Sequence, residues 1–563
     1  MRTENRHRPT SGRHRSRWPL LVASFATAAV GCIDEGASSS AVTPATSDSF
    51  VPLSLTKPGE AAPLSSADTR EEEAALSPEV RAQPDGPLLG AVHFMVSVYE
   101  RPDHRATKIG YLRVGMKVPR GQKPAAFDSC AKGFYNIQPH GFVCLDDGAT
   151  VDMEHPILKA EIHQADRSKP LPYHYGFIRA IAPRYYRLPS VDEQIKYEMS
   201  LKRHLRSFRR LKDKWNAIAV GSNDVRILPD GVVLGPPPAD PPELNSFEKF
   251  GGTDGAIPWF FKGGRQIPNV ANFKVPEYAV ITNRIKRHAG VSLIGAMAGE
   301  ERDFALTADL RLIPISKLKP ARGSVFHGVE LTEGWELPVA FVKRRGPDEK
   351  GVREYRKTGG RFKRTSKRIA YGTPIQLTGE VHRDGKRRYV ETELGTWLRT
   401  FDLAIAPLSS KLPRVSKRKQ KWVDVSIQRQ TLILYEGTKP VYATMVSTGK
   451  DGLGDPRKSH STPRGLFRIR DKHVTTTMDS QVVGEEFELQ DVPYVQYFKA
   501  GYALHAAYWH TEFGRPRSHG CINLAPLDAY RIFHWTKPHV PDRWHSGAAS
   551  PLLGEGTYVY VHP

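Results

Sequence analysis

The sequence predicts a mostly β protein that is divided into several small domains. The chain has 563 residues, which at about 150 residues per domain leaves room for three or four. Gly and Pro number 47 and 44, a frequency typical of short strands joined by many turns. Hydrophobic residues make up 39% of the chain, so a sizeable core can form and a wholly disordered protein is excluded. No apolar run reaches about 18 residues, which excludes a polytopic membrane protein.

Positive charge predominates. Lys and Arg together number 82 against 60 Asp and Glu, which gives a net charge of +22. Nucleic acid, an anionic membrane surface and the acidic polymers of a cell wall are the partner classes that such a charge attracts.

The first residues decide among these classes. Several arginines precede an apolar stretch at 19–30, and small residues then lead to Cys32. This is the layout of a secretory signal over 1–32. It resembles a bacterial lipoprotein signal, in which the cysteine is lipidated after cleavage. We therefore expect an exported protein of the periplasm or cell envelope, anchored to a membrane through lipid on Cys32, with no nucleic-acid partner. The start of a buried helix is the alternative interpretation of this stretch.

Residues 33–88 are rich in Ser, Ala, Pro, Thr and Glu, which predicts a disordered tether. Export also affects how the remaining cysteines are interpreted. Cys130 and Cys144 lie 14 residues apart in a segment of short strands, and in an oxidising compartment we expect them to form a disulfide. Closing such a loop stabilises a fold by about 3 kcal/mol. Cys521 is then left as a free thiol, which invites oxidation unless it has a function.

Short strand-like segments recur between residues 89 and 148, separated by turns, and predict a small barrel. The run resembles a bacterial SH3-like domain. The run ends at 141–147 with an aromatic residue, strand residues and a turn that contains Asp. The same order of residues occurs again at 303–310 and 396–403. We therefore expect three SH3-like modules, over 89–150, 170–320 and 321–412, followed by a basic linker at 413–421. Three unrelated β-turns are the alternative.

The middle module is expected to carry a helical insertion. Between 191 and 215, large apolar residues recur every three or four positions, which predicts one amphipathic helix. Its basic face is formed by Lys202, Arg203, Arg206, Arg209 and Arg210. This face either contacts an anionic polymer or is simply solvated.

The segment that carries chemistry is 501–524. A cysteine nucleophile needs an imidazole that takes its proton, a backbone that presents N–H groups to an oxyanion, and access to solvent. Gly520 directly precedes Cys521 and gives the backbone freedom, while His505 and His519 are candidate bases.

The sequence SHGCINL at 518–524 resembles the active-site signature of the L,D-transpeptidases, the YkuD-type catalytic domain. Three further segments match that family in order: the opening hairpin at 422–437, Val446-Ser447-Thr448-Gly449, and the TPRGLF sequence at 462–467. His505 occupies the place of the family's other motif histidine. The resemblance covers 422–563 and implies a β-rich, β-sandwich-like domain.

The resemblance implies a reaction on peptidoglycan stem peptides without a cofactor or a metal. Cys521 would attack the carbonyl of the third residue of a tetrapeptide stem and release D-Ala, and His505 would accept and donate the proton. An acceptor amine, of another stem in a 3-3 crosslink or of a protein, would then resolve the thioester. His519 is expected to orient the loop, although the two histidine roles can be exchanged. Gly520 and the Cys521 amide are oxyanion candidates, and Ser518 and Asn523 belong to the substrate-binding set. The family often has Arg where Asn523 stands here, so a carboxylate contact is expected from Arg464, Arg515 or Arg517.

Several other functions fit parts of the pattern. Three imidazoles and a thiolate, from His505, His510, His519 and Cys521, would suit zinc. A wall-binding relative without activity is a second alternative. A hydrolase of wall crosslinks, with water in place of the acceptor amine, is a third.

Overall fold

The computed structural model describes residues 75–563 except 161, 217–226, 229–230, 233–275, 277, 322, 333, 344–350, 410–411 and 481–486. The predicted signal at 1–32, the lipidation site Cys32 and the predicted tether up to residue 74 lie outside the described residues. The rest of that segment, up to residue 88, packs on the first module, where Ala82 is 2% exposed and its N–H donates to Asn136 Oδ1 at 2.9 Å. Within them, none of the helices is both long and apolar enough to cross a membrane.

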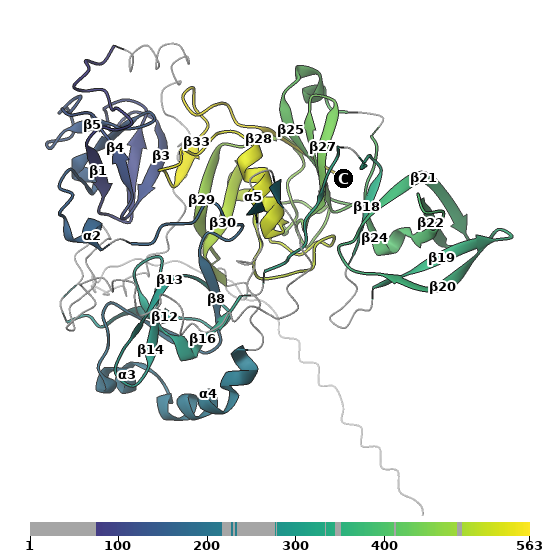
Figure 1. The fold of residues 1–563 in the computed structure, drawn as a ribbon, viewed down its shortest axis with the longest axis horizontal. Coiled ribbons are helices and arrows are strands. Elements are labelled where there is room, and N and C mark those ends of the chain that lie inside the picture. The colour runs from purple at the N-terminus through teal and green to yellow at the C-terminus, as the bar shows by residue number, and fades with distance from the viewer. Residues whose placement is uncertain are drawn as a thin grey trace, which may run out of the picture. The chain divides into compact units, whose positions relative to one another are not determined.

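Strands dominate the described chain, which confirms the mostly β prediction (Figure 1). In the first module, β1 (Leu88–Ala91) pairs with β4 (Lys117–Pro119) and β7 (Ala149–Thr150). A second layer contains β2 (Met95–Tyr99), β3 (Lys108–Arg113), β5 (Phe134–Asn136) and β6 (Phe142–Cys144). A disulfide joins Cys130 to Cys144 at the end of β6, among the buried Tyr99, Phe134 and Phe142. The SH3-like assignment of this and the next two modules stays a prediction.

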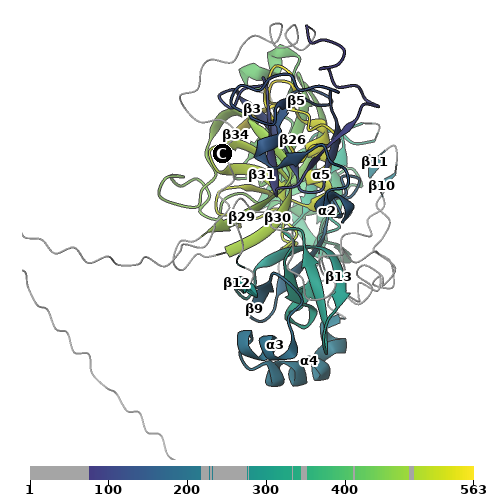
Figure 2. The same cartoon turned by 90° about the vertical axis from the view of Figure 1, so that its left-hand side faces the viewer.

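The second module is a sheet that two helices flank at one end. Its strands are β8 (His174–Ile178), β9 (Ala182–Tyr185), β12 (Ile281–Ile285), β13 (Gly290–Ala298), β14 (Asp303–Thr307), β15 (Leu312–Pro314) and β16 (Leu318–Pro320). The helices α3 (Val191–Tyr197) and α4 (Leu201–Asn216) follow β9 and lie together at that end (Figure 2).

The expectation of one continuous helix over 191–215 is therefore wrong. Glu198 leaves the helical conformation at φ −112° and ψ 112°, and Ser200 adopts φ 56°. The reason is the Glu198 carboxylate, whose side chain is fully buried and needs partners, which lie on β9 and in the turn between β13 and β14. It accepts a hydrogen bond from the Tyr185 hydroxyl at 3.0 Å and pairs with Arg302. The hydrogen bond and the ion pair that the Glu198 carboxylate makes therefore interrupt the helix.

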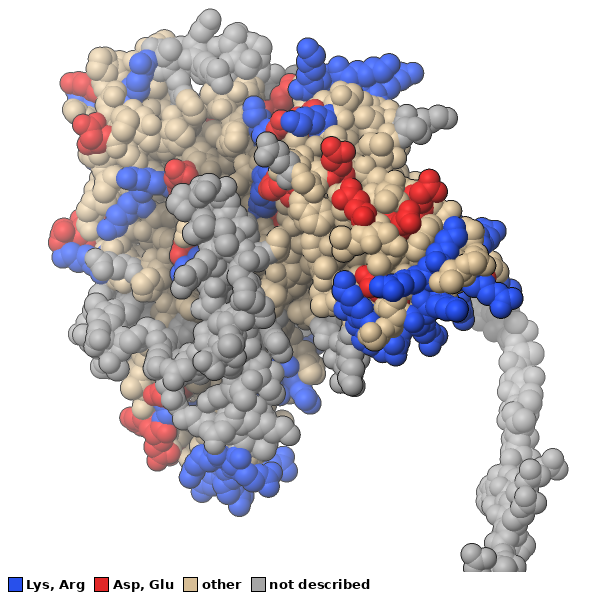
Figure 3. Space-filling view, turned by 45° about the vertical axis from the view of Figure 1, so that its right-hand side comes forward, with Lys and Arg blue, Asp and Glu red and all other residues tan. Residues whose placement is uncertain are grey.

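The third module is a seven-stranded sheet in the order β20-β19-β23-β22-β21-β18-β24. The strands are β18 (Val339–Val342), β19 (Val352–Thr358), β20 (Arg361–Ile369), β21 (Pro374–Asp384), β22 (Arg387–Thr392), β23 (Trp397–Arg399) and β24 (Leu403–Ala406). Much of the exposed surface of β20 and of the β21–β22 hairpin is Lys and Arg, which form one of the basic patches in Figure 3.

The C-terminal domain has two sheets with a shared core. The first has the order β17-β27-β26-β25-β34-β28. It contains β17 (Val329–Glu330), β25 (Lys421–Ser426), β26 (Thr431–Glu436), β27 (Lys439–Met445), β28 (Gly465–Arg468) and β34 (Tyr558–His562). The second contains β29 (Asp471–Ser480), β30 (Phe487–Lys499), β31 (Tyr502–Ala506), β32 (Ile522–Leu524) and β33 (Ser546–Ala548). Helix α5 (Pro526–Trp535) packs on β30 and β31 (Figure 1).

Three strand pairs connect the upstream modules to this domain, one of them β17 with β27 through Val329 and Ala443. β3 pairs with β33 through Gly110 and Gly547, and β13 pairs with β30 through Gly290 and Leu489. The predicted linker at 413–421 is also packed, since Val415 is 3% exposed within an apolar cluster. The upstream modules thus share hydrogen-bonded sheets with the domain that carries Cys521.

Candidate active site

Cys521 directly precedes β32, which pairs with β31 in parallel. In this pair His505 lies opposite Asn523. Leu504 and Ile522 are fully buried in the core, so by alternation His505 and Asn523 share the opposite face. Cys521, two residues before Asn523, belongs to that same face. The parallel pair therefore brings three predicted site residues to one side of the sheet.

The segment 446–449 is hydrogen-bonded to both ends of residues 518–523, which we call the cysteine loop. Ser447 and Asn523 exchange two backbone hydrogen bonds, each of 2.9 Å. The Ser518 N–H donates to the Thr448 carbonyl at 3.1 Å, and the Gly449 N–H donates to Thr462 Oγ1 at 2.9 Å. Three of the motifs that the sequence placed in order are therefore in direct contact.

Within the loop, Ser518 closes a tight turn. Its hydroxyl donates to the Cys521 carbonyl and accepts the Gly520 N–H at 3.0 Å. Gly520 has φ 115°, and a Cβ there would come within 2.5 Å of the Tyr502 ring, so only glycine fits. Because the Gly520 N–H is already bonded, the Cys521 N–H is the stronger of the two oxyanion candidates.

The Cys521 thiol is partly exposed and sits against apolar side chains. Its neighbours in one cluster are Val492, Val495, Tyr497 and Ala503. Burial raises the pKa of the Cys521 thiol to about 11, so the thiol is protonated at neutral pH. A nucleophilic reaction at this cysteine therefore requires a base that takes the proton during the attack.

His505 is in the protonation state that such a base requires. It is 2% exposed, and burial lowers its pKa to about 4, so the imidazole is neutral at pH 7. Nδ1 lies 3.0 Å from the Ala506 carbonyl oxygen. Because a carbonyl can only accept, Nδ1 carries the ring proton and Nε2 carries the free lone pair.

His510 and Asn523 form a buried pair. The Glu512 N–H donates to His510 Nδ1 at 3.3 Å, which places the ring proton on Nε2. Nε2 lies 3.0 Å from the side-chain amide of Asn523. When the Asn523 side-chain amide is oriented with Oδ1 towards His510, Oδ1 accepts this proton. This orientation gives a hydrogen-bond partner to a buried oxygen that otherwise has none. Sequence reasoning considered His510 only as a zinc ligand, although its spacing of five residues from His505 was visible.

His519 has a different environment. It is exposed and stacks on Phe487 with ring centroids 5.4 Å apart, and its ring is 4.6 Å from that of His460. The exposed His519 and the buried His505 are thus unequal candidates for the base. Among the described residues, the groups of three metal-ligating side chains with atoms within 4.8 Å of one another include none of the four residues considered for zinc.

The three arginines considered for a carboxylate contact are placed unevenly. Arg517 pairs with Glu512, and its N–H donates to the Thr448 carbonyl at 2.9 Å, so it stands beside the loop. Arg464 is exposed and Arg515 is half-buried. Their contact with a substrate stays a prediction.

The C-terminal part of the chain matches a known family. Residues 420–561 match the family model of the L,D-transpeptidase catalytic domain, YkuD. YciB of Bacillus subtilis, whose own assignment as an L,D-transpeptidase is provisional, is 26% identical over 162 residues. That match covers 24% of this chain and 69% of YciB. These two findings support an L,D-transpeptidase catalytic domain in this part of the chain.

Solved structures give matches of similar extent. An Enterococcus faecium L,D-transpeptidase mutant is 23% identical, with a TM-score of 0.20, over 25% of this chain and 49% of the other. An L,D-transpeptidase from Stackebrandtia nassauensis is 27% identical, with a TM-score of 0.18, over 25% of this chain and 55% of the other. The chain thus spans about half the length of these two structures.

Proposed function

We propose that the protein is a peptidoglycan L,D-transpeptidase of the bacterial envelope, with Cys521 as its nucleophile. The observation that carries the proposal is the neutral His505 on the same face as the partly exposed Cys521 thiol, inside a domain that matches the family model. The thiol needs a base and His505 offers a lone pair on Nε2.

The reaction proceeds in two acyl transfers. The Cys521 Sγ attacks the carbonyl carbon of the third stem residue while its proton passes to His505. The bond to the terminal D-Ala then breaks, and His505 donates the proton to the leaving amine. An acceptor amine attacks the resulting thioester, loses its proton to His505 and releases the thiol.

The oxyanion of each tetrahedral intermediate needs a donor at the loop. The Cys521 N–H fills this role in the proposal, since the Gly520 N–H is bonded to Ser518. The buried His510–Asn523 pair positions β32, which Cys521 directly precedes, and Arg517 supplies a cation beside the loop for the stem carboxylate.

The location follows from the same proposal. Export through the signal at 1–32 brings the enzyme to its substrate, and the disulfide between Cys130 and Cys144 fits an oxidising compartment. A lipid on Cys32 would hold the chain at a membrane. In this proposal the SH3-like modules at 89–150, 170–320 and 321–412 locate the enzyme in the envelope, with wall contact through the third.

Incubation with purified disaccharide tetrapeptides, followed by mass analysis of the products, tests the function. Loss of D-Ala with formation of a dimer linked through third residues supports crosslinking, and attachment to an added lysine-bearing peptide supports protein attachment. Release of the tripeptide alone identifies a hydrolase, in which water resolves the thioester. No change of the tetrapeptide, with a folded protein, contradicts the proposal and favours a wall-binding role.

A further inference from the structure

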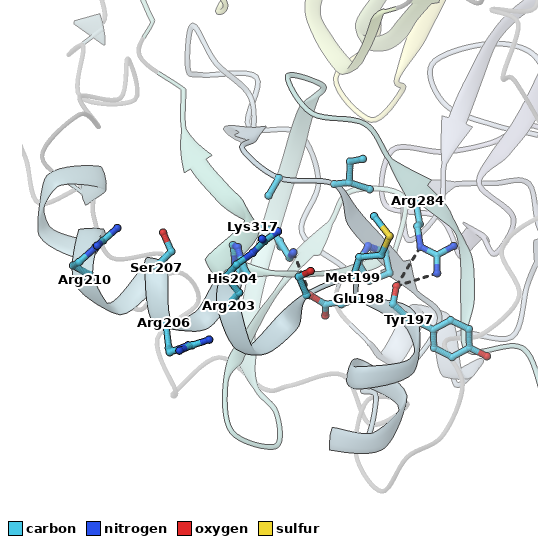
Figure 4. Close-up of a pocket in the computed structure, with 14 residues that line it drawn as sticks. Tyr197, Glu198, Met199, Arg203, His204, Arg206, Ser207, Arg210, Arg284 and Lys317 are labelled. Carbon is cyan, nitrogen blue, oxygen red and sulfur yellow. Dashed lines mark hydrogen bonds and ion pairs between the residues drawn. The ribbon is translucent and has the colours of Figure 1, made fainter.

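A cavity of about 1140 Å³ lies in the second module, between α4 and the strands beside it (Figure 4). All of its lining residues fall between Ala180 and Lys317, so it shares none with the cysteine loop. Five cationic side chains are among them: Arg203, Arg206, Arg210, Arg284 and Lys317. The cavity is therefore a second candidate site, separate from the proposed chemistry.

The positive charge of this cavity is largely uncompensated. Glu198 is the one acidic residue of the lining, and its buried carboxylate already pairs with Arg302 and with Lys317. In the part of the chain that the structure describes, the guanidinium groups of Arg203, Arg206 and Arg210 make neither an ion pair nor a side-chain hydrogen bond. They lie at i, i+3 and i+7 along α4 and therefore share one face. Three free guanidiniums in a row suit several phosphate groups.

Apolar side chains stand exposed at the same cavity. Met199 is 81% exposed and Ile181 is 52% exposed, and both line it. Ile195 of α3, close by in sequence, is 51% exposed. Exposed large apolar side chains beside cations, such as Met199 and Ile181 at this cavity, indicate an interaction surface.

We propose that this face of the second module docks on an anionic phospholipid surface. Arg203, Arg206 and Arg210 bind headgroup phosphates at the cavity, while Met199 and Ile181 enter the boundary between headgroups and acyl chains. A hydrated polyanion would use the guanidiniums but would leave Met199 and Ile181 in water. The apolar pair is thus the feature that favours a lipid surface over a soluble polymer.

Vesicle sedimentation with the chain from residue 33 onward tests the proposal, because this form lacks Cys32 and the apolar stretch before it. Vesicles of phosphatidylcholine with about one third phosphatidylglycerol are compared with pure phosphatidylcholine at 0.15 M salt. We expect binding to the anionic vesicles alone. Soluble glycerophosphate at millimolar concentration should compete only weakly, because it offers no apolar phase; full competition would identify a phosphate site without membrane docking and overturn the proposal.

Two pairs of substitutions on the same helix separate a site from general attraction. Arg206→Gln with Arg210→Gln removes two lining charges, and Lys202→Gln with Arg209→Gln removes two exposed charges outside the lining. An interfacial cation contributes about fivefold in affinity, so the lining pair should lower binding roughly 25-fold and the control pair clearly less. Equal losses would show that only net charge matters.

The apolar contribution has a matched control as well. Met199→Ser should weaken vesicle binding several-fold without changing the charge, whereas Leu394→Ser, at a residue 79% exposed in the third module, should not. If Met199→Ser binds vesicles like the parent chain, membrane docking is refuted. Because these residues lie outside the cysteine loop, turnover of soluble tetrapeptide is expected to stay unchanged in every variant.

Discussion

Arg113 of the first module and Asp491 of the C-terminal domain form a buried ion pair, with Nη1 and Oδ1 2.6 Å apart and both side chains at most 6% exposed. The Asp491 carboxylate also accepts hydrogen bonds from Ser292 of the second module and from Thr475. Asp491 lies on β30, next to Val492, which packs in the cluster around Cys521. One carboxylate thus joins two upstream modules to the wall of the candidate site.

Arg113→Gln should destabilise the protein strongly. Removing one partner of a buried pair leaves a charge without compensation, which typically costs about 3–5 kcal/mol. Denaturant unfolding measures the loss. Arg105→Gln is the matched control, because Arg105 pairs with Asp103 at the surface and its side chain is 91% exposed. A variant at Arg113 as stable as this control would show that Asp491 does not hold the modules together.

The effect of Arg113→Gln should depend on pH. Burial opposes ionisation of Asp491, but the Arg113 charge and the hydrogen bonds to Arg113, Ser292 and Thr475 outweigh it and lower its pKa. The stabilisation is therefore present above the ordinary Asp pKa of about 3.9 and is lost as pH falls through the lower folded value. In the variant, Asp491 has lost its cation and takes up a proton at a higher pH than in the parent chain. The difference in unfolding free energy between the two proteins should therefore narrow at about pH 4. A constant gap between pH 7 and pH 4 would contradict the assignment.

Thiol titration tests the disulfide. Material from an oxidising compartment that starts after Cys32, once unfolded, should show one free thiol, Cys521, and three after reduction. The reason is the bond between Cys130 and Cys144, whose Cα atoms lie 6.0 Å apart. Three thiols before reduction would refute the bond in the protein as made.

The two histidines should differ in acylation. His505→Ala removes the proposed base and should slow acylation by about 10²- to 10⁴-fold, whereas loss of the exposed His519 should cost less. Stopped-flow or quenched mass analysis of the acyl-enzyme gives the rates. The reverse ranking would exchange the two roles.

The pH profile follows from the buried His505. With its pKa lowered to about 4, the imidazole stays able to accept a proton down to about pH 4. The acylation rate of the parent enzyme should therefore hold as pH falls through 6.5 and decline only near pH 4. A decline centred on the ordinary His pKa of about 6.5 would indicate a solvated base such as His519.

The basic hairpins of the third module should attract the cell wall. Exposed residues of β20 include Lys363, Arg364, Lys367 and Arg368. Wall sacculi carry carboxylates, so pelleting with sacculi should weaken as salt rises from 0.15 M to 1 M and the Debye length falls from about 8 Å to about 3 Å. Substituting these four residues by Gln should weaken pelleting at low salt while tetrapeptide turnover persists. Unchanged pelleting would show that another surface of the protein makes the wall contact.

Local sequence patterns predicted the strands, the cysteine loop and its motif partners, because alternation, turn residues and family motifs are local signals. The break between α3 and α4 was not predicted, because it depends on the partners of Glu198, among which Arg302 lies 104 positions away. The pair of Arg113 with Asp491 spans 378 positions and has no local signature. For the same reason the segment at 413–421, which is basic and resembles a linker, was not expected to pack through Val415.

Intact-mass analysis of the enzyme after brief incubation with purified disaccharide tetrapeptide tests the central claim most directly. The parent chain should carry one adduct with the mass of the muropeptide less D-Ala, and Cys521→Ala should carry none while unfolding at the same denaturant concentration. The adduct should disappear when an acceptor amine is added. An equal adduct on Cys521→Ala, or a folded parent enzyme that neither forms the adduct nor releases D-Ala, would contradict the assignment of Cys521 as the nucleophile of an L,D-transpeptidase.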